Sequence, residues 1–387
     1  MKIFVVAGAR PNFMKVAPLV AALRARGEHL RDVETLLVHT GQHYDAQMSD
    51  EFFRDLEMPA PDIHLGAGSG THAEQTARVM VAFEKICVEQ KPDLVVVVGD
   101  VNSTLACALA AKKLSIAVAH VEAGLRSRDR SMPEEINRLC TDVISDLLFT
   151  TDQQADDNLL REGCQQRRIR FVGNTMIDSL CRHLPRALAQ PLPLGLHAGS
   201  YALLTLHRPS NVDDPESLRN MLGAIQRIAE RIPVIFPAHP RTAQRLAGTS
   251  LHERLLVIEP LGYLAFLGLM ARARMVLTDS GGIQEETTVL QVPCLTLRNN
   301  TERPITCTMG TNILAGTDPR EIVKLAMQVL NSPPPKGRIP EKWDGHAGER
   351  IADELIGWLQ RKGPTADAYG RETRVDLLAP NASRAAR

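Results

Sequence analysis

Residues 94–100 read Leu-Val-Val-Val-Val-Gly-Asp, a run of apolar residues that ends on a glycine and a carboxylate. An apolar run of this length, without polar alternation, is typical of a central parallel strand buried on both faces. Ligands of open parallel sheets bind beyond the carboxyl ends of the strands. The stretch therefore predicts an α/β protein, and it makes Asp100 a candidate functional residue.

The same alternation of short β-rich runs and longer helix-period runs extends in both directions from this strand. Further strands are predicted at residues 3–7, 34–40, 117–121, 147–150 and 169–172, with helices opening at Pro11 and over residues 103–113. Repeated βα units of this kind form a parallel sheet with right-handed crossovers. We therefore expect a first Rossmann-like domain over residues 1–175.

The pattern changes in the middle of the chain and then resumes. A Leu-, Pro- and Gly-rich stretch at 184–200 predicts a linker. A second α/β series follows, with strands at 202–206, 234–237, 256–258, 275–278 and 294–297 and helices at 216–230 and 282–290. We expect a second Rossmann-like domain over residues 176–363, with the active site in the cleft between the two. Residues 364–387 are polar and aperiodic and are expected to be a disordered tail.

Composition excludes several classes of partner. The 387 residues contain 45 Lys plus Arg and 45 Asp plus Glu, and this balance argues against a nucleic-acid binder or a polybasic membrane anchor. The longest apolar runs are of strand length, so no membrane span is expected. The seven cysteines form no C-x-x-C pair, which is typical of a reducing compartment. A cytoplasmic α/β enzyme is the expectation.

Cations follow the first predicted strand. Gly8-Ala-Arg-Pro11 is a tight turn that opens a helix, and Lys15 lies one helical turn further on. Arg10 and Lys15 at a helix N-terminus suit a phosphate group. A plain βα turn with solvated charges explains the same residues, and this motif alone does not decide between the two.

Carboxylates follow the neighbouring strands. Asp100 and Glu122 stand directly after two of them, and a loop then delivers Glu134 and Glu135, with Arg138 one turn on. Each acid can be the cap or first-turn residue of the next helix, but all three segments having only that role is less expected. Carboxylates held in different environments can have their pKa values driven apart, so that one acts as base and another as acid.

The second domain offers a matching set of polar residues after its strands. His207 and Arg208 follow its first strand, and Ser280, Gly281 and Gly282 open a helix where a diphosphate can approach the backbone closely. Glu285 or Glu286, one turn inside, is placed to accept hydrogen bonds from ribose hydroxyls. For Glu285 we favour a solvated position on the helix face, and the Glu302–Arg303 pair is either functional or a surface ion pair.

Other kinds of chemistry have weak support in the sequence. His39 and His43 are four residues apart, but they flank a strand end and loop rather than one helix face, so no metal site is expected. No P-loop ending and no Gly-x-Ser-x-Gly elbow is present.

Taken together, these segments resemble the non-hydrolysing UDP-N-acetylglucosamine (UDP-GlcNAc) 2-epimerase family, whose members have the GT-B fold of two Rossmann domains. The matching motifs occur in the family's order over roughly residues 1–360: Gly8-Ala-Arg-Pro11 with Lys15, His39-Thr-Gly-Gln-His43, Val98-Gly-Asp100, His120-Val-Glu-Ala-Gly-Leu-Arg126, Pro133-Glu-Glu-Ile-Asn-Arg138, Gly173-Asn-Thr175, His207-Arg208 and Thr278-Asp-Ser-Gly-Gly-Ile-Gln-Glu-Glu286.

The resemblance implies roles for individual residues. The implied catalytic residues are Asp100, Glu122, Glu134 and His207. The residues implied to bind the UDP-sugar are Arg10, Lys15, Gln42, His43, Arg138, Arg208, Ser280, Gly281, Gly282 and Glu286. The implied reaction interconverts UDP-GlcNAc and UDP-ManNAc by elimination of UDP to 2-acetamidoglucal and re-addition, for polysaccharide precursor synthesis. It needs no redox cofactor or metal, and the resemblance suggests a homodimer.

Three alternatives stay open. A related family epimerises UDP-2,3-diacetamido-glucuronic acid, and Arg126, Arg128 or Arg130 are candidates to face the carboxylate of that sugar. A GT-B glycosyltransferase shares the nucleotide site but does not need Asp100, Glu122 and Glu134 together. A catalytically silent nucleotide-sugar binding protein would not need these acids at all.

Overall fold

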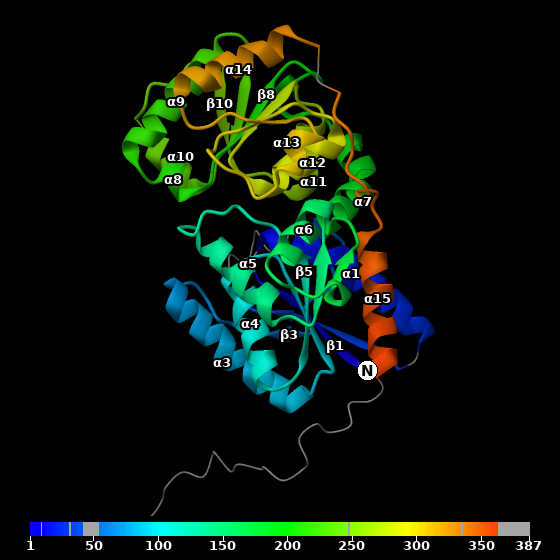
Figure 1. The fold of residues 1–387 in the computed structure, drawn as a ribbon. Coiled ribbons are helices and arrows are strands. Elements are labelled where there is room, and N and C mark those ends of the chain that lie inside the picture. The colour runs from blue at the N-terminus through cyan, green and yellow to red at the C-terminus, as the bar shows by residue number, and fades with distance from the viewer. Residues whose placement is uncertain (9, 31, 42–53, 247, 334–335, 363–387) are drawn as a thin grey trace, which may run out of the picture.

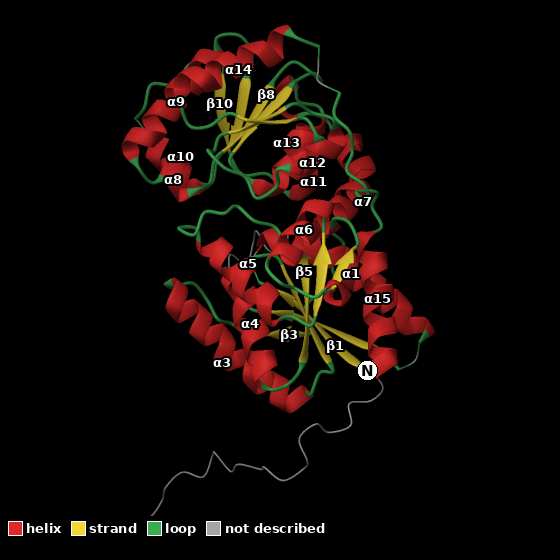
Figure 2. Cartoon of the chain, in the orientation of Figure 1, coloured by secondary structure: helices red, strands yellow, loops and turns green. Residues whose placement is uncertain are grey.

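The computed structural model describes residues 1–8, 10–30, 32–41, 54–246, 248–333 and 336–362. Within them the chain forms two parallel sheets, each covered by helices on both faces (Figures 1 and 2). The structure thus confirms the predicted α/β class with two Rossmann-like units. Gln42, His43 and the expected C-terminal tail lie outside the described residues.

The first sheet has the order β3-β2-β1-β4-β5-β6-β7. Its strands are β1 (Lys2–Ala7), β2 (Glu34–His39), β3 (Ile63–His64), β4 (Leu94–Val98), β5 (Ala117–Ala123), β6 (Leu147–Thr150) and β7 (Ile169–Phe171). The apolar run that opened the sequence argument is the central strand β4, and all five of its residues are buried. The order reverses between β1 and β4, which is the point in such sheets where ligands bind.

Helices cover this sheet in two layers. α3 (His72–Gln90), α4 (Asn102–Lys113) and α5 (Pro133–Ile144) pack side by side on one face. α1 (Arg10–His29) packs against α7 (Thr175–Ala189) and the C-terminal helix α15 (Ala347–Lys362). α6 (Gln153–Arg161) follows β6, and the 3-10 turn Gln166–Arg168 then leads into β7.

The second sheet has the order β10-β9-β8-β11-β12-β13. Its strands are β8 (Ala202–Thr205), β9 (Val234–Pro237), β10 (Leu255–Ile258), β11 (Met275–Thr278), β12 (Cys294–Thr296) and β13 (Asn312–Leu314). Its helices are α8 (Pro209–Val212), α9 (Pro215–Ala229), α10 (Pro240–Leu246), α11 (Tyr263–Ala271), α12 (Gly281–Leu290), α13 (Ile305–Thr308) and α14 (Pro319–Asn331). The short outer strands β3 and β13 were missed by the sequence argument because two or three residues carry little periodicity.

Helix α7 links the two units. The sequence predicted a linker from residue 184, but α7 runs through Pro185 to Ala189 and packs against both α1 and α11. Its buried face explains why the helix continues past the proline, since tertiary packing outweighs the local propensity to stop. The irregular stretch begins only at Gln190 and includes the 3-10 turn Pro193–Gly195.

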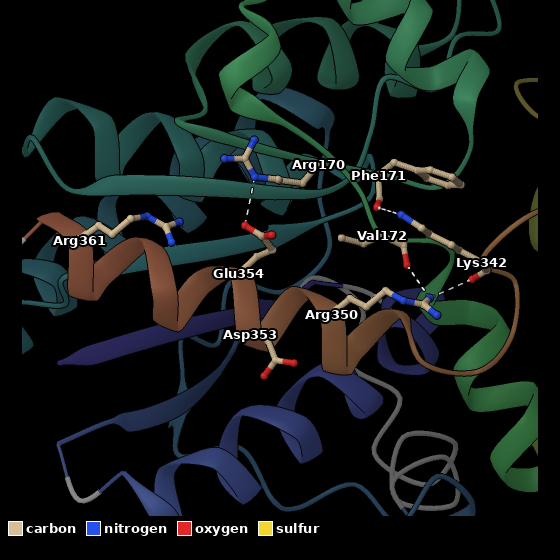
Figure 3. Close-up of a pocket in the computed structure, with 8 residues that line it drawn as sticks. All are labelled: Arg170, Phe171, Val172, Lys342, Arg350, Asp353, Glu354 and Arg361. Carbon is tan, nitrogen blue, oxygen red and sulfur yellow. Dashed lines mark hydrogen bonds and ion pairs between the residues drawn. The ribbon is translucent and has the colours of Figure 1, made fainter.

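The chain returns to the first unit at its end. Figure 3 shows α15 beside strand β7, where Arg350 donates to the Val172 carbonyl at 3.0 Å and Arg170 pairs with Glu354 at 3.1 Å. Lys342 donates to the Phe171 carbonyl at 2.8 Å. Lys342 and Arg350 thus donate to carbonyl groups at the edge of the first sheet. Residues 347–362 therefore pack with the first sheet although they follow the second in sequence.

Two further features bear on the expectations from composition. No helix among the described residues is long and apolar enough to cross a membrane. All seven cysteines are free thiols.

Candidate active site at the domain boundary

Asp100 follows strand β4 at the boundary between the two units. Gly99 has φ +70°, a left-handed conformation that turns the chain sharply at the strand end. The Asp100 carboxylate is ion-paired with Arg138 of α5, and its carbonyl accepts a hydrogen bond from Asn137 at 2.9 Å. Burial alone would raise the pKa of Asp100, but Arg138, Lys15 and Arg303 together hold it below its usual value.

Glu122 lies at the end of β5, the neighbouring strand. Its φ is +70°, unusual for a residue other than glycine, and the pairing with β6 shifts register at this point. Its carboxylate is only 3% exposed and bonds two cations: Lys15 of α1 at 2.5 Å and Arg303 of the second unit at 2.9 Å. The acid therefore ties the two halves of the molecule together.

Arg303 is the centre of this charged cluster. Its guanidinium contacts Glu122, Glu285 at 2.7 Å and Glu302 at 2.5 Å, and the side chain is 5% exposed. The sequence left the Glu302–Arg303 pair open between a functional pair and a surface pair, and the structure buries both residues. The sequence around Glu302 and Arg303 shows only one charged pair on a turn. It gives no signal that segments distant in sequence converge on Arg303.

The sequence argument was wrong about Glu285. We expected a solvated charge on the helix face, but the side chain is 1% exposed and paired with Arg303. Burial, only partly offset by the Arg303 cation, raises the pKa of Glu285 to about 7. Helix α12 buries both Glu285 and Glu286 because it packs between its own sheet and α7.

His207 and Arg208 follow strand β8, and a buried acid orients both. Asp279 accepts the backbone N–H groups of His207 at 3.1 Å and of Arg208 at 3.0 Å, and it contacts His207 Nδ1 at 2.8 Å. The His207 side chain remains 59% exposed. Burial acts to raise the pKa of Asp279, but the bonds from His207 and Arg208 hold it below its usual value. Asp279 is a positioning residue. It lies in the 278–286 motif, but no role for it was predicted from the sequence.

Glu134 and Glu135 have different surroundings in the first turn of α5. Glu135 is buried and accepts from the Ser127 and Arg128 backbone N–H groups, each at 2.9 Å, and from Arg138 at 3.0 Å. Glu134 is half-buried, and its charge acts on Arg208 of the second unit. Glu135 thus fixes the loop at Ser127 and Arg128, whereas Glu134 lies at the boundary between the two units.

The start of α12 presents the small residues predicted from the sequence. A Cβ added to Gly281 would lie 2.5 Å from Glu302 Oε1 and would also overlap Arg303, so a larger residue here displaces this ion pair. Within the helix, Glu286 accepts a hydrogen bond from the Tyr263 hydroxyl at 3.1 Å. Burial raises the pKa of Glu286 to about 8.

The structure brings most of the described candidates to one boundary. Lys15, Glu122, Arg303, Glu302 and Arg208 form a continuous series of ion pairs, with the Arg208–Glu302 contact at 3.7 Å. Arg10 is the first residue of α1, and its side chain is not described. Among the described residues, no group of three or more His, Cys, Asp and Glu side chains is arranged to hold a metal ion.

Comparison with known proteins places this arrangement in a family. Residues 26–356 match the family model described as UDP-N-acetylglucosamine 2-epimerase. A UDP-N-acetylglucosamine 2-epimerase of Methanocaldococcus jannaschii is 44% identical over 372 residues, which cover 91% of this chain and 98% of that protein. A UDP-2,3-diacetamido-2,3-dideoxy-D-glucuronate 2-epimerase of Pseudomonas aeruginosa is 41% identical over 360 residues, covering 92% and 99%.

A solved structure agrees with the sequence matches. The M. jannaschii UDP-GlcNAc 2-epimerase, crystallised with UDP-GlcNAc and UDP, superposes with a TM-score of 0.84 at 43% identity, covering 92% of this chain and all of that one. The match extends over both sheets and the boundary between them. The chain therefore belongs to the UDP-N-acetylglucosamine 2-epimerase family.

Proposed function

We propose that the protein interconverts UDP-GlcNAc and UDP-ManNAc. The observation that carries this proposal is the charged boundary itself, where Asp100 and Glu122 lie beside Lys15, Arg138 and Arg303. The relatives at 41–46% identity that bear this activity in their names span nearly the whole chain. The product would supply polysaccharide precursor synthesis.

The chemistry explains why such a site needs both acids and cations. The hydrogen on carbon 2 of the sugar is not acidified by a neighbouring carbonyl, so simple proton exchange is slow. In an elimination, a carboxylate takes this proton, a carbon 1–carbon 2 double bond forms, and the carbon 1–oxygen bond breaks with its electron pair leaving on UDP. Re-addition of UDP and return of a proton to the opposite face give the epimer.

Asp100, Glu122 and Glu134 supply the proton-transfer groups in this proposal. Asp100 and Glu122 come from adjacent strand ends, and Glu134 approaches from α5. Their surroundings differ in burial and in paired cations, which is how one site maintains a base and an acid together. His207, oriented by Asp279, lies on the side of the second unit and acts at the departing UDP.

Cations and a helix N-terminus hold the diphosphate. Lys15 and Arg10 of α1 and Arg208 of the second unit supply positive charge, and the start of α12 at Ser280, Gly281 and Gly282 supplies a helix N-terminus. Glu286 accepts from the ribose hydroxyls. Gln42, His43 and Arg138 complete the proposed contacts to the sugar nucleotide.

Incubation with UDP-GlcNAc in heavy water tests the proposal. NMR of carbon 2 is expected to show UDP-ManNAc forming and deuterium entering both epimers. Retention of all protium with no UDP-ManNAc would contradict the assigned reaction. Epimer formation without solvent deuterium would contradict the elimination route alone.

The similarity to the P. aeruginosa enzyme favours a second candidate substrate, UDP-2,3-diacetamido-glucuronic acid. The sequence offered Arg126, Arg128 and Arg130 to recognise its carboxylate. Arg126 is wrong for this role, because its buried guanidinium is paired with Asp142 at 2.7 Å and with Glu162. Arg128 bonds Asn158 at 2.8 Å. Parallel assays with the two sugars should favour UDP-GlcNAc, and preference for the acidic sugar would reverse the assignment.

The homodimer implied by the resemblance and the cytoplasmic location expected from composition belong to the same proposal. Sedimentation equilibrium is expected to give twice the chain mass. A monomer at all concentrations would contradict the dimer without affecting the assigned reaction.

A further inference from the structure

A cluster of buried polar side chains around His120 adjoins the turns that carry Asp100 and Glu122. His120 is the residue on β5 two positions before Glu122, and it is completely buried. Its Nδ1 lies 2.6 Å from Asp142 Oδ1, and its Nε2 lies 2.8 Å from the Gly99 carbonyl oxygen. Nothing in the proposed reaction so far uses this histidine.

Asp142 connects His120 to further residues of this cluster. Its second oxygen accepts from Arg126 at 2.7 Å and from the Gly124 backbone N–H at 3.1 Å. Arg126 in turn pairs with Glu162. The four side chains thus form a linear series in the order His120, Asp142, Arg126 and Glu162, and the first three are at most 1% exposed.

The Gly99 carbonyl fixes the role of His120 Nε2. A carbonyl oxygen only accepts hydrogen bonds, so Nε2 carries a proton and donates to it. The other ring nitrogen faces Asp142, which is itself held on its far side by Arg126 and the Gly124 N–H. Asp142 therefore orients the ring, and the ring donates to the turn that carries Asp100.

The His120 cluster makes hydrogen bonds to both turns that carry the candidate acids, Asp100 and Glu122. The Gly99 carbonyl belongs to the peptide bond that leads into Asp100, and the Gly124 N–H lies just beyond Glu122. Gly99 and Glu122 both have φ of +70°, so neither turn continues its strand. Asp142 lies one helical turn after Arg138 on α5, which holds the Asp100 side chain. One helix therefore fixes the Asp100 backbone through His120 and its carboxylate through Arg138.

We propose that His120, held in place by Asp142, is a positioning residue that aims Asp100 at the reacting sugar through its hydrogen bond to the Gly99 carbonyl. This inference rests on the proposed epimerase function. A misplacement of about 1 Å in a reacting group can cost about 100-fold in rate, so this bond matters to turnover more than to binding.

Two amide substitutions separate the two bonds of the ring. In His120→Gln the amide nitrogen takes the place of Nε2 and can still donate to Gly99, but the bond to Asp142 is lost. In His120→Asn the amide nitrogen takes the place of Nδ1 and can donate to Asp142, but the bond to Gly99 is lost. Each variant lacks one buried hydrogen bond, and His120→Gln should lose more thermal stability because it leaves a buried carboxylate oxygen without its donor.

The proposal predicts different kinetics for this pair. His120→Asn should lose about 100-fold in kcat with KM for UDP-GlcNAc changed by less than about twofold, whereas His120→Gln should stay within about tenfold of wild type. Equal kcat values in the two variants, or a loss expressed in KM instead, would overturn the positioning role. Asp178→Asn is the control: Asp178 is a buried acid that accepts from Ala347 and Gly348 away from the site, and its loss should lower Tm alone.

A second measurement does not depend on activity. In protein labelled with 15N-histidine, the ring signals that vanish in His120→Gln identify His120. The Nε2 nitrogen should carry a slowly exchanging proton, because it donates to a buried carbonyl. An Nε2 nitrogen without a proton would contradict the hydrogen bond to Gly99. If the wild type shows no epimerase activity, the proposed function fails, and this spectrum still decides the state of His120.

Discussion

At the residue scale, Glu122 combines a strained backbone with two cationic partners. A left-handed φ at a residue with a side chain costs about 1–3 kcal/mol and persists only where the surroundings enforce it. Here Lys15 and Arg303 bind its carboxylate from two different units. Strain of this kind gathers at functional sites, which agrees with the role proposed for this acid.

Asp100→Asn tests the neighbouring acid. The amide keeps the shape of the side chain but accepts no proton, so we expect kcat to fall by about 100-fold or more. UDP binding, measured by titration calorimetry, should change little because the diphosphate contacts lie elsewhere. Full turnover in this variant would remove Asp100 from the proton-transfer set.

Glu286 predicts how stability depends on pH. Because burial raises its pKa to about 8, the folded protein binds this proton more tightly than the unfolded chain does. The resulting stability is complete at low pH and is lost as pH rises from about 4.5 to about 8. Glu286→Gln keeps a neutral partner for Tyr263 and does not titrate. Its Tm should equal that of wild type near pH 5 and exceed it near pH 9; a difference independent of pH would contradict the assignment.

At the element scale, the start of α12 depends on a glycine. Gly281→Ala places a methyl group against Glu302 and Arg303, so both must move. We expect UDP binding to weaken about tenfold, equivalent to about 1.4 kcal/mol. Gly223→Ala in α9 is the matched control, since a Cβ there meets nothing within 4 Å. That change should raise stability by about 0.5–1 kcal/mol and leave binding unchanged. Equal affinities in the two variants would show that α12 tolerates the methyl group.

At the scale of the whole molecule, the C-terminal helix α15 belongs to the packing of the first unit. Its residues Ile351, Ala352 and Leu355 are completely buried, and α15 packs on α1 (Figure 1). Helix α15 thus ties the second unit back onto the first, and Arg303 makes a second connection at the boundary.

Leu355→Ala measures this contribution. The buried cavity should cost about 2–5 kcal/mol in the free energy of unfolding, measured with denaturant. Leu188→Ala on α7, where the side chain is 45% exposed, should change it by less than about 0.5 kcal/mol. If the two variants lose the same stability, α15 is not part of the first unit's core.

The α/β class and the main strands follow from local sequence pattern alone. A buried parallel strand must be apolar throughout, as 94–98 is, and helix periodicity between such runs leaves few other topologies. The same local pattern also placed Asp100, Glu122, His207 and Gly281 at strand ends or at a helix start, because those positions are local and follow from the βα repeat.

Which charges meet depends on long-range packing and has no local signal in the sequence. Arg303 pairs with Glu122 across the boundary between the two units and with Glu285 inside the second unit, and no local pattern links the three. The same holds for His120, whose two hydrogen bonds go to a carbonyl and a carboxylate from other segments. Sequence periodicity reports which face of an element is buried, but the partner of a buried charge is set by long-range packing, and that partner fixes its protonation and its role.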